Sequence, residues 1–230
     1  MIYITGDKHG SIQLDDLSTS NWPEGQSLTK NDYLIVAGDF GGIFHGGETD
    51  RKVLDYYEAC PWTTLFVDGN HENFDLLARY PVTEWNGGKV QYVRPSVIHL
   101  MRGQIYKIDG KTFFTMGGAT SVDKDYRIEG QSWWKEELPS GEEYFEADRN
   151  LAACGNKVDY IITHCCSARQ YYRFAARDFH SFVHDSLTDY LNELEKRVEF
   201  KHWYYGHHHQ DIEVDEQHTM LCRKVVRIIE

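Results

Sequence analysis

Five short apolar runs, each followed at once by residues that commonly bind metal ions, constrain this chain more than any other feature of its sequence. The runs are residues 2–5, 33–37, 64–67, 160–163 and 202–205. Each is apolar enough to be a β-strand buried on both faces, as in a parallel or mixed central sheet. Open α/β sheets bind ligands where the carboxyl ends of such strands converge. The pattern therefore predicts an α/β fold with a polar site at one edge of a sheet.

Other segments add helices and antiparallel strands to this plan. Apolar residues recur at helical spacing over residues 181–198, and residues 50–59 also favour a helix. Residues 89–119 are β-rich and broken by glycines, which predicts antiparallel strands. Residues 213–229 predict a hairpin that closes a sheet.

The acidic segment of residues 123–148 interrupts this regular pattern. It contains Trp133-Trp134 and is expected to form either a cap beside the site or a surface loop. The chain length is typical of one α/β domain, so we expect a single domain over residues 1–230.

The composition argues against several functional classes. With a formal net charge of -12, the chain is not expected to bind nucleic-acid duplexes, because such binding depends largely on Lys and Arg. No apolar stretch of the sequence approaches the roughly 18 residues of a membrane helix, so no membrane partner is expected. The five cysteines are odd in number and lack C-x-x-C spacing, which predicts free thiols and a cytoplasmic location. The oligomeric state is left open.

Seven candidate metal ligands follow the five apolar runs. They are three oxygen donors and four imidazoles, namely Asp7, Asp39, Asn70, His9, His164, His207 and His209. This set is too large for one four-coordinate ion and suits two, with the carboxylate of Asp39 as the natural bridge. Mixed nitrogen and oxygen donors favour manganese, which we expect first, or iron, zinc, cobalt or nickel, over calcium. The sequence therefore predicts two divalent metal ions as cofactors.

The ordered motifs resemble those of the calcineurin-like metallophosphoesterase superfamily. They are Gly6-Asp7-x-His9-Gly10, Gly38-Asp39, Gly69-Asn70-His71-Glu72, Thr163-His164 and Gly206-His207-x-His209. The resemblance implies an α/β fold, a four-layer αββα sandwich of two mixed sheets flanked by helices. It also implies that one metal is held by Asp7, His9, Asp39 and His209, and a second by Asp39, Asn70, His164 and His207.

The same resemblance implies a phosphoesterase in which His71 contacts the substrate and protonates the leaving group. Two metals about 3.5 to 4 Å apart can polarise a phosphoryl oxygen and lower the pKa of a bridging water, so that hydroxide forms at neutral pH. His208 lies between two expected ligands and is expected to point away from the metals.

Two departures from the superfamily pattern bear on the substrate. In the phosphoprotein phosphatase branch, the bridging Asp is followed three residues later by a second Asp and then an Arg, whereas position 42 here is Gly. Asp68 stands where that branch usually has Arg. A serine/threonine protein phosphatase is therefore the weaker alternative, and we expect phosphodiesters or small phosphate esters as substrates.

The stretch from Gly117 to Asp123, followed by Arg127 and Trp133-Trp134, resembles bacterial and phage-type members of the superfamily. Arg127 is a candidate substrate-binding residue that would clamp the phosphate, and a surface ion pair is its alternative role. A nuclease and a catalytically silent binding module are further alternatives, although His71 and all expected ligands are retained.

Overall fold

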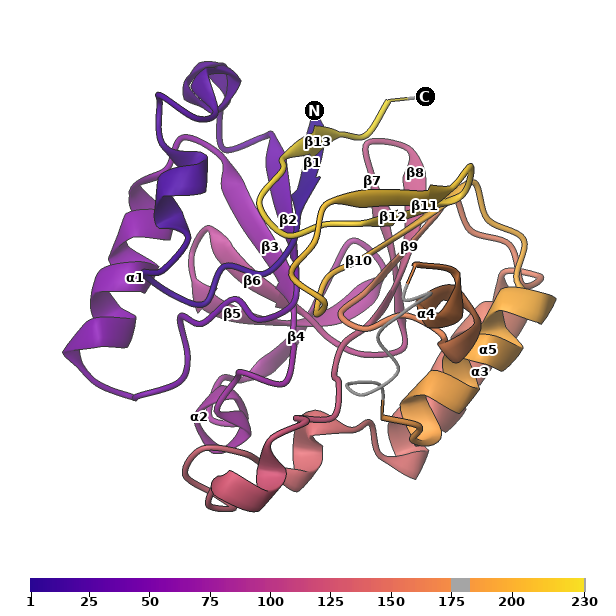
Figure 1. Ribbon diagram of the computed structural model, residues 1–230. Coiled ribbons are helices and arrows are strands. Elements are labelled where there is room, and N and C mark those ends of the chain that lie inside the picture. Colours follow the sequence, from indigo (N-terminus) through magenta and orange to yellow (C-terminus); the bar gives the residue numbers. More distant parts are fainter. Residues whose placement is uncertain (175–182, 230) are drawn as a thin grey trace.

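The first sheet gathers the strands of the N-terminal half of the chain and one strand from the C-terminus. The computed structural model describes residues 1–174 and 183–229 (Figure 1). The sheet order is β13-β1-β2-β3-β6-β5-β4. The strands are β1 (Ile2–Thr5), β2 (Tyr33–Ala37), β3 (Thr63–Val67), β4 (Val82–Trp85), β5 (Gly88–Arg94), β6 (Val97–Leu100) and β13 (Val226–Arg227). The central strands β1, β2, β3 and β6 are parallel, so their carboxyl ends meet at one edge.

The second sheet has the order β11-β12-β10-β9-β8-β7. Its strands are β7 (Gln104–Ile108), β8 (Lys111–Met116), β9 (Tyr160–Thr163), β10 (His202–Tyr205), β11 (Ile212–Asp215) and β12 (His218–Met220). Strands β8, β9, β10 and β12 are parallel, and the outer strands β7 and β11 pair antiparallel. The carboxyl ends of β9 and β10 therefore also lie at a common edge.

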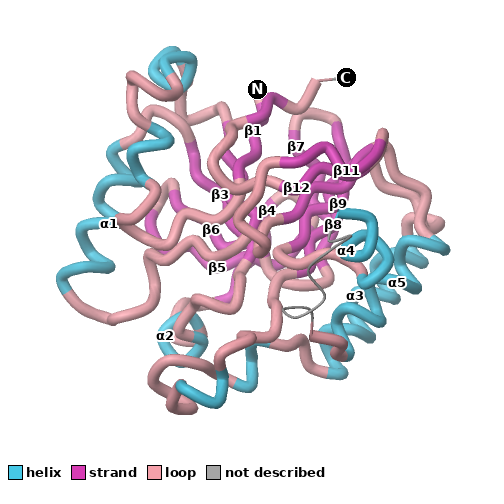
Figure 2. Tube along the Cα trace, in the orientation of Figure 1, coloured by secondary structure: helices cyan, strands magenta, loops and turns pink. Residues whose placement is uncertain are grey.

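Helices cover the outer faces of both sheets, as Figures 1 and 2 show. The α-helices are α1 (Glu48–Ala59), α2 (Phe74–Leu77), α3 (Gly141–Ala153), α4 (Ala168–Phe174) and α5 (Ser186–Arg197). Short 3-10 helices are η1 (Leu14–Leu17), η2 (Pro23–Ser27), η3 (Lys124–Tyr126) and η4 (Lys135–Glu137). Helix α1 packs on the first sheet, and α3, α4 and α5 pack on the second.

Alternating side chains along the strands divide the apolar residues between these layers. In β2, Ile35 and Ala37 lie in the core between the two sheets, while Leu34 and Val36 pack in the cluster that contains α1. This two-residue period is the geometry of a strand buried on both faces. The expected four-layer αββα sandwich is confirmed.

The helix predicted over residues 181–198 is shorter in the structure. Residues 181 and 182 lie outside the described part of the chain, and residues 183–185 are not helical. Asp185 has an extended backbone and caps α5, its carboxylate accepting a hydrogen bond from the Thr188 amide at 2.8 Å. A side-chain cap of this kind satisfies an amide at the helix start and fixes the first turn. The prediction therefore extended the helix past its cap.

Two other predicted segments are also corrected. Over residues 213–229, β11 and β12 form an antiparallel hairpin, but β13 crosses over to pair with β1 in the other sheet. The excursion predicted over residues 123–148 ends earlier, because a capping box of Ser140 and Glu143 starts α3. Within residues 1–174 and 183–229, no helix combines the length and apolarity needed to cross a bilayer.

Candidate metal centre

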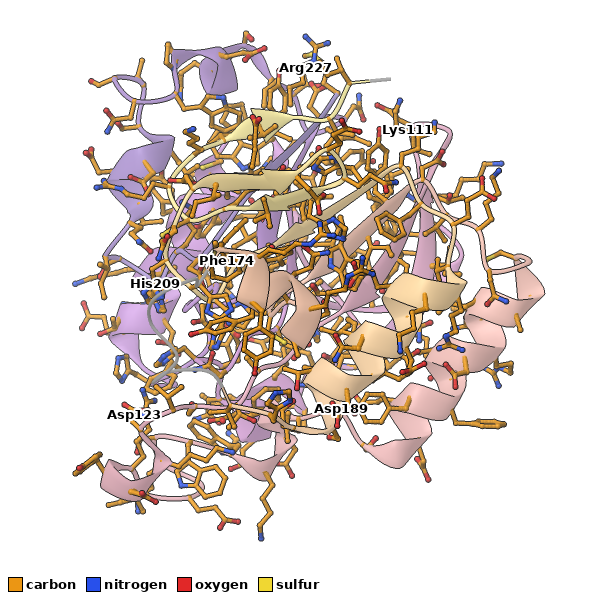
Figure 3. The ribbon with its side chains drawn as sticks, turned by 45° about the vertical axis from the view of Figure 1, so that its right-hand side comes forward. Lys111, Asp123, Phe174, Asp189, His209 and Arg227 are labelled. Carbon is orange, nitrogen blue, oxygen red and sulfur yellow. The ribbon has the colours of Figure 1, made fainter. Side chains whose placement is uncertain are left out.

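Five loops at the carboxyl ends of β1, β2, β3, β9 and β10 bring the seven predicted ligands together. Asp7, His9, Asp39 and His209 form one group, whose potential ligand atoms all lie within 4.8 Å of one another. The two carboxylates are buried. The side chain of His209, which is labelled in Figure 3, is 57% exposed. This group therefore combines two buried carboxylates with a solvent-accessible imidazole.

A second group adjoins the first and shares Asp39 with it. His164 Nε2 lies 3.1 Å from Asn70 Oδ1 and 3.3 Å from Asp39 Oδ1. The ring of His207 packs against that of His164 at a centroid distance of 5.0 Å. The other oxygen of Asp39, Oδ2, lies 3.7 Å from His9 Nε2 in the first group. Asp39 thus directs one oxygen toward each group.

Hydrogen bonds outside the two groups orient their donors. His164 Nδ1 donates to the Ala37 carbonyl at 2.9 Å, which leaves Nε2 free to coordinate. The His207 amide donates to Asp7 at 2.9 Å and the His71 amide donates to Asp39 at 2.8 Å. Outer contacts of this kind fix ring tautomers and carboxylate positions around protein metal sites.

The ligand loops carry backbone strain. His9, Asp39, His207 and His209 have positive φ angles of 45°, 46°, 69° and 52°. Residues with a Cβ seldom adopt this left-handed region, and such strain clusters at functional sites. The loops turn sharply as they leave their strands, and the turns aim the side chains at a common point.

Two motif glycines are required by close packing of the ligands themselves. A Cβ on Gly38, whose φ is +89°, would lie 2.1 Å from Nδ1 of His164. A Cβ on Gly69 would lie 2.1 Å from Oδ1 of Asp39. Any larger residue at either position would displace a donor of the second group.

The charges of the site favour bound cations. Among the residues that the structure describes, Asp7 and Asp39 form ion pairs within 4 Å with histidines alone. Burial raises the pKa of Asp7 to about 6, against the opposing effect of His164. Buried carboxylates without a compensating cation are costly. The donor set and its two buried carboxylates both fit divalent metal ions.

The sequence of the chain also matches a known protein family. The sequence profile of the calcineurin-like phosphoesterases matches residues 1–211. The chain belongs to this family. Membership makes the protein a phosphoester hydrolase and implies divalent metal ions as its cofactors. A search of curated proteins found no match.

Among solved structures, phosphopantetheinyl hydrolase from Mycobacterium tuberculosis is similar to this calcineurin-like phosphoesterase. The similarity covers 96% of this chain and 89% of the other, with 16% sequence identity and a TM-score of 0.41.

The pKa of His164 is raised, whereas burial lowers the pKa of His9, His71 and His207 in the same phosphoesterase site. Burial alone would lower the pKa of His164, but the charge of Asp39 and the hydrogen bond to it outweigh burial and raise the pKa to about 10. The same contact holds the pKa of Asp39 below its usual range, against the effect of burial. Burial lowers the pKa of His9 to about 4. In the metal-free protein, a proton on His164 would therefore offset part of the charge of Asp39.

His71 and Arg127 lie side by side next to the two donor groups. Arg127 Nη1 is 3.5 Å from His71 Nδ1, and the ring of His71 packs edge-on against that of His9 at 5.2 Å. Arg127 is positioned by Asp123, 2.6 Å from its Nε, and by the Ser132 carbonyl, to which Nη1 donates at 2.9 Å. The ion pair expected as the alternative role of Arg127 is thus present, and it also aims the guanidinium at the site.

Glu72 is a buried residue of the site for which we predicted no role from the sequence. Its carboxylate accepts hydrogen bonds from the amides of Gly41, at 3.1 Å, and Gly69. Burial, reinforced by the charge of Asp39, raises its pKa to about 8. Glu72 therefore ties the loop after β2 to the loop after β3. Its place in the Gly69-Asn70-His71-Glu72 motif was the available signal.

His208 points away from the donors, as expected. Its Nε2 lies 3.4 Å from Sγ of Cys166, and its ring packs against those of Tyr171 and Phe174. His99 is buried against Asp68, with its Nε2 3.1 Å from Oδ1. His180 lies outside the described residues.

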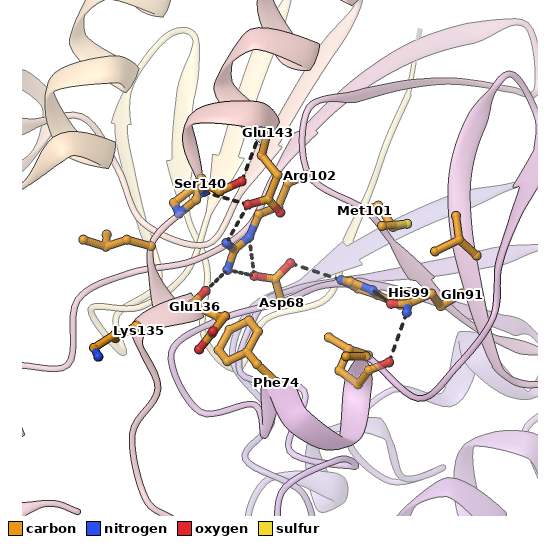
Figure 4. Close-up of a pocket in the computed structure, with 15 residues that line it drawn as sticks. Asp68, Phe74, Gln91, His99, Met101, Arg102, Lys135, Glu136, Ser140 and Glu143 are labelled. Carbon is orange, nitrogen blue, oxygen red and sulfur yellow. Dashed lines mark hydrogen bonds and ion pairs between the residues drawn. The ribbon is translucent and has the colours of Figure 1, made fainter. Parts of the chain in front are cut away.

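A cavity of about 620 Å³ borders the loop after β3, with Asp68 in its wall (Figure 4). Its apolar walls include Phe74, Leu77 and Leu138, and Asp68 and Arg102 form an ion pair within it. Arg102 donates to Oδ2 of Asp68 from Nε at 2.8 Å and from Nη2 at 2.6 Å. Because Asp68 immediately precedes Gly69 and Asn70, this pair anchors one end of a ligand loop.

Proposed function

We propose that this calcineurin-like phosphoesterase hydrolyses phosphodiesters or small phosphate esters with two divalent ions, manganese being the first candidate. The observation that carries the proposal is Asp39, which directs its two oxygens toward two separate donor groups. Asp7, His9 and His209 would complete one metal site, and Asn70, His164 and His207 the other. Bound there, the ions would polarise the phosphoryl oxygens and lower the pKa of a water molecule.

His71 is the proposed general acid. In hydrolysis a water oxygen bonds to phosphorus, the bond to the ester oxygen breaks, and that oxygen takes up a proton. His71 lies beside both donor groups without belonging to either and can supply this proton. Burial lowers its pKa, Asp39 raises it, and Arg127 lowers it again. A negatively charged phosphate ester beside the ring would favour the protonated form.

Arg127 is the proposed phosphate clamp. A guanidinium can donate two parallel hydrogen bonds to phosphate oxygens. The side chain of Arg127 is 17% exposed and is held next to His71 by Asp123 and Ser132. The charge that orients the ester would therefore come from the segment that follows β8.

The environment of Gly42 supports small esters over phosphoproteins. A Cβ at this position would lie 2.4 Å from Cε1 of Phe40. Phe40 is itself fully buried and stacks on Phe66 at 4.4 Å, so its ring has no room to yield. Position 42 is therefore closed to the Asp of the protein phosphatase branch, and Ile43 stands where that branch has its Arg. A monoanionic diester needs a second phosphate clamp less than a dianionic monoester does.

Matched substrates test this proposal. The value of kcat/KM would be compared for bis(4-nitrophenyl) phosphate, 4-nitrophenyl phosphate and a panel of phosphoserine and phosphothreonine peptides, with Mn²⁺ present. We expect the diester or another small ester to exceed every phosphopeptide. In Arg127→Met the loss should be larger for the monoester than for the diester, and Arg149→Met, at an exposed pair on α3, is the control. A phosphopeptide hydrolysed faster than all small esters would restore the protein phosphatase alternative.

A further inference from the structure

The segment between β8 and α3 contributes two buried polar residues to the second donor group, although neither is a ligand. Ser121 is 4% exposed and Glu137, in η4, is fully buried. Both lie far from Asn70 in the sequence. Ser121 nevertheless contacts the Asn70 side chain directly, and Glu137 is connected to it through Ser121.

Three hydrogen bonds form a chain from Asn70 to Glu137. Asn70 Nδ2 donates to Ser121 Oγ at 3.1 Å. Ser121 Oγ donates to Glu137 Oε1, and the Ser121 amide donates to Oε2, both at 2.9 Å. The carboxylate of Glu137 thus accepts twice from one residue, which fixes the Ser121 hydroxyl in position and direction.

The direction of this chain determines the orientation of the Asn70 amide. Because the hydroxyl proton of Ser121 is used on Glu137, Ser121 Oγ can only accept from Asn70. The NH₂ group of Asn70 must therefore face Ser121, and its Oδ1 faces His164, 3.1 Å away. An inverted amide would place an oxygen against an acceptor and present a nitrogen without a lone pair to the cation.

We propose that Ser121 and Glu137 are positioning residues that hold Asn70 Oδ1 in the metal-binding orientation. This inference rests on the proposed two-metal function. Lys124, whose Nζ lies 3.6 Å from Glu137 Oε2, places a positive charge beside the buried carboxylate. The same segment carries Arg127, so one excursion of the chain both orients a metal ligand and supplies the phosphate clamp.

Binding of Mn²⁺ to the metal-free protein tests the role of Ser121 without reference to activity. Free Mn²⁺ would be measured by electron paramagnetic resonance during titration of wild type, Ser121→Ala and Ser121→Thr. Loss of a residue that orients a ligand typically weakens metal binding about 10–100-fold. We expect that loss at one of the two sites in Ser121→Ala, little change at the other site, and recovery in Ser121→Thr.

Ser167→Ala is the matched control, because Ser167 is also buried and donates to a glutamate, Glu195 Oε2, at 2.9 Å. It should bind both ions as wild type does. Equal weakening in Ser167→Ala and Ser121→Ala, or unchanged binding in Ser121→Ala, would overturn the inference. A wild type that binds a single ion would overturn the two-metal function together with it.

A double-mutant cycle separates orientation from simple packing. In Asn70→Asp the two side-chain oxygens are chemically equivalent, so no amide needs to be oriented. Adding Ser121→Ala to Asn70→Asp should then cause no further loss of Mn²⁺ affinity. An equal loss in both backgrounds would show that Ser121 supports the loop without orienting the amide. If Ser121→Ala does not fold, Ser121→Cys, a weaker hydrogen-bond partner, is titrated in the same cycle.

Discussion

Replacing Asp68 by Asn should destabilise the protein strongly although Asp68 is not a metal ligand. Asp68 is 1% and Arg102 6% exposed, and the Arg102 guanidinium donates twice to Asp68 Oδ2. Breaking a buried ion pair by removing one partner costs about 3–5 kcal/mol. Asn keeps one acceptor, and Arg102 retains the Glu136 carbonyl and Glu143, 3.5 Å away, so the lower end of about 3 kcal/mol applies.

This free energy converts to a shift in melting temperature. For a chain of this size each kcal/mol corresponds to about 2–4 °C, so we expect Tm to fall by about 6–12 °C. Urea unfolding of the metal-free protein gives the free energy directly, from the midpoint and slope. Asp55→Asn is the control, because Asp55 pairs with Arg94 at 3.5 Å on the surface, where such pairs contribute about 0.2–1 kcal/mol.

The difference in stability between wild type and Asp68→Asn should also depend on pH, in a direction set by the pKa of Asp68. Burial opposes ionisation of Asp68, but Arg102 and His99 outweigh it and hold the pKa of Asp68 well below its usual range. A depressed pKa contributes stability above the unfolded-state value of about 3.9, and the contribution disappears as pH falls through the folded-state value. The difference between wild type and Asp68→Asn should therefore be full at neutral pH and shrink below about pH 4. If Asp68→Asn and Asp55→Asn were equally stable at pH 7, the buried-pair reasoning would be wrong.

Two further predictions concern the site. His71→Ala should lower turnover by about 100-fold or more, because a general acid contributes about 10²–10⁴-fold. The metal content should stay near that of wild type, and His45→Ala, at an exposed histidine, is the control. Loss of metal in His71→Ala, measured by elemental analysis, would contradict this role. Binding of divalent ions should release about one proton per chain near pH 7–8, because His164, with a pKa of about 10, must give up its proton to coordinate. Metal affinity should then rise about tenfold per pH unit over this range. Calorimetry in buffers with different ionisation heats measures the protons released on metal binding, and a release of none would refute this coupling between metal binding and deprotonation of His164.

The strands that deliver the ligands could be predicted because each is a run buried on both faces and ends in a motif. The local pattern of apolar residues was less informative where a side-chain hydrogen bond determines the end of a helix. The start of α5 depends on the hydrogen bond between Asp185 and Thr188, which interrupts the helical spacing of apolar residues. The pairing of β13 with β1 joins the two ends of the chain, and a two-residue strand carries almost no periodic signal.

The seven ligand candidates were likewise visible in the sequence, since each lies within four residues of the end of a strand. The residues that orient them were not. Ser121 and Glu137 are separated from Asn70 by about fifty residues or more and reach it only through the tertiary fold. Arg102 and His99 meet Asp68 in the same way, across strands that are adjacent in space. No spacing rule links such partners, because the contact depends on how the sheets and their loops pack.

The number of metal ions per chain, measured together with their effect on hydrolysis, tests the central claim most directly. The metal-free protein would be titrated with Mn²⁺, the bound metal quantified by elemental analysis, and hydrolysis of an aryl phosphate ester followed at each step. Two ions per chain at saturation, with activity lost on chelation and restored by Mn²⁺, is the expected result. Saturation at one ion per chain, or activity that survives complete removal of metal, would contradict the two-metal account.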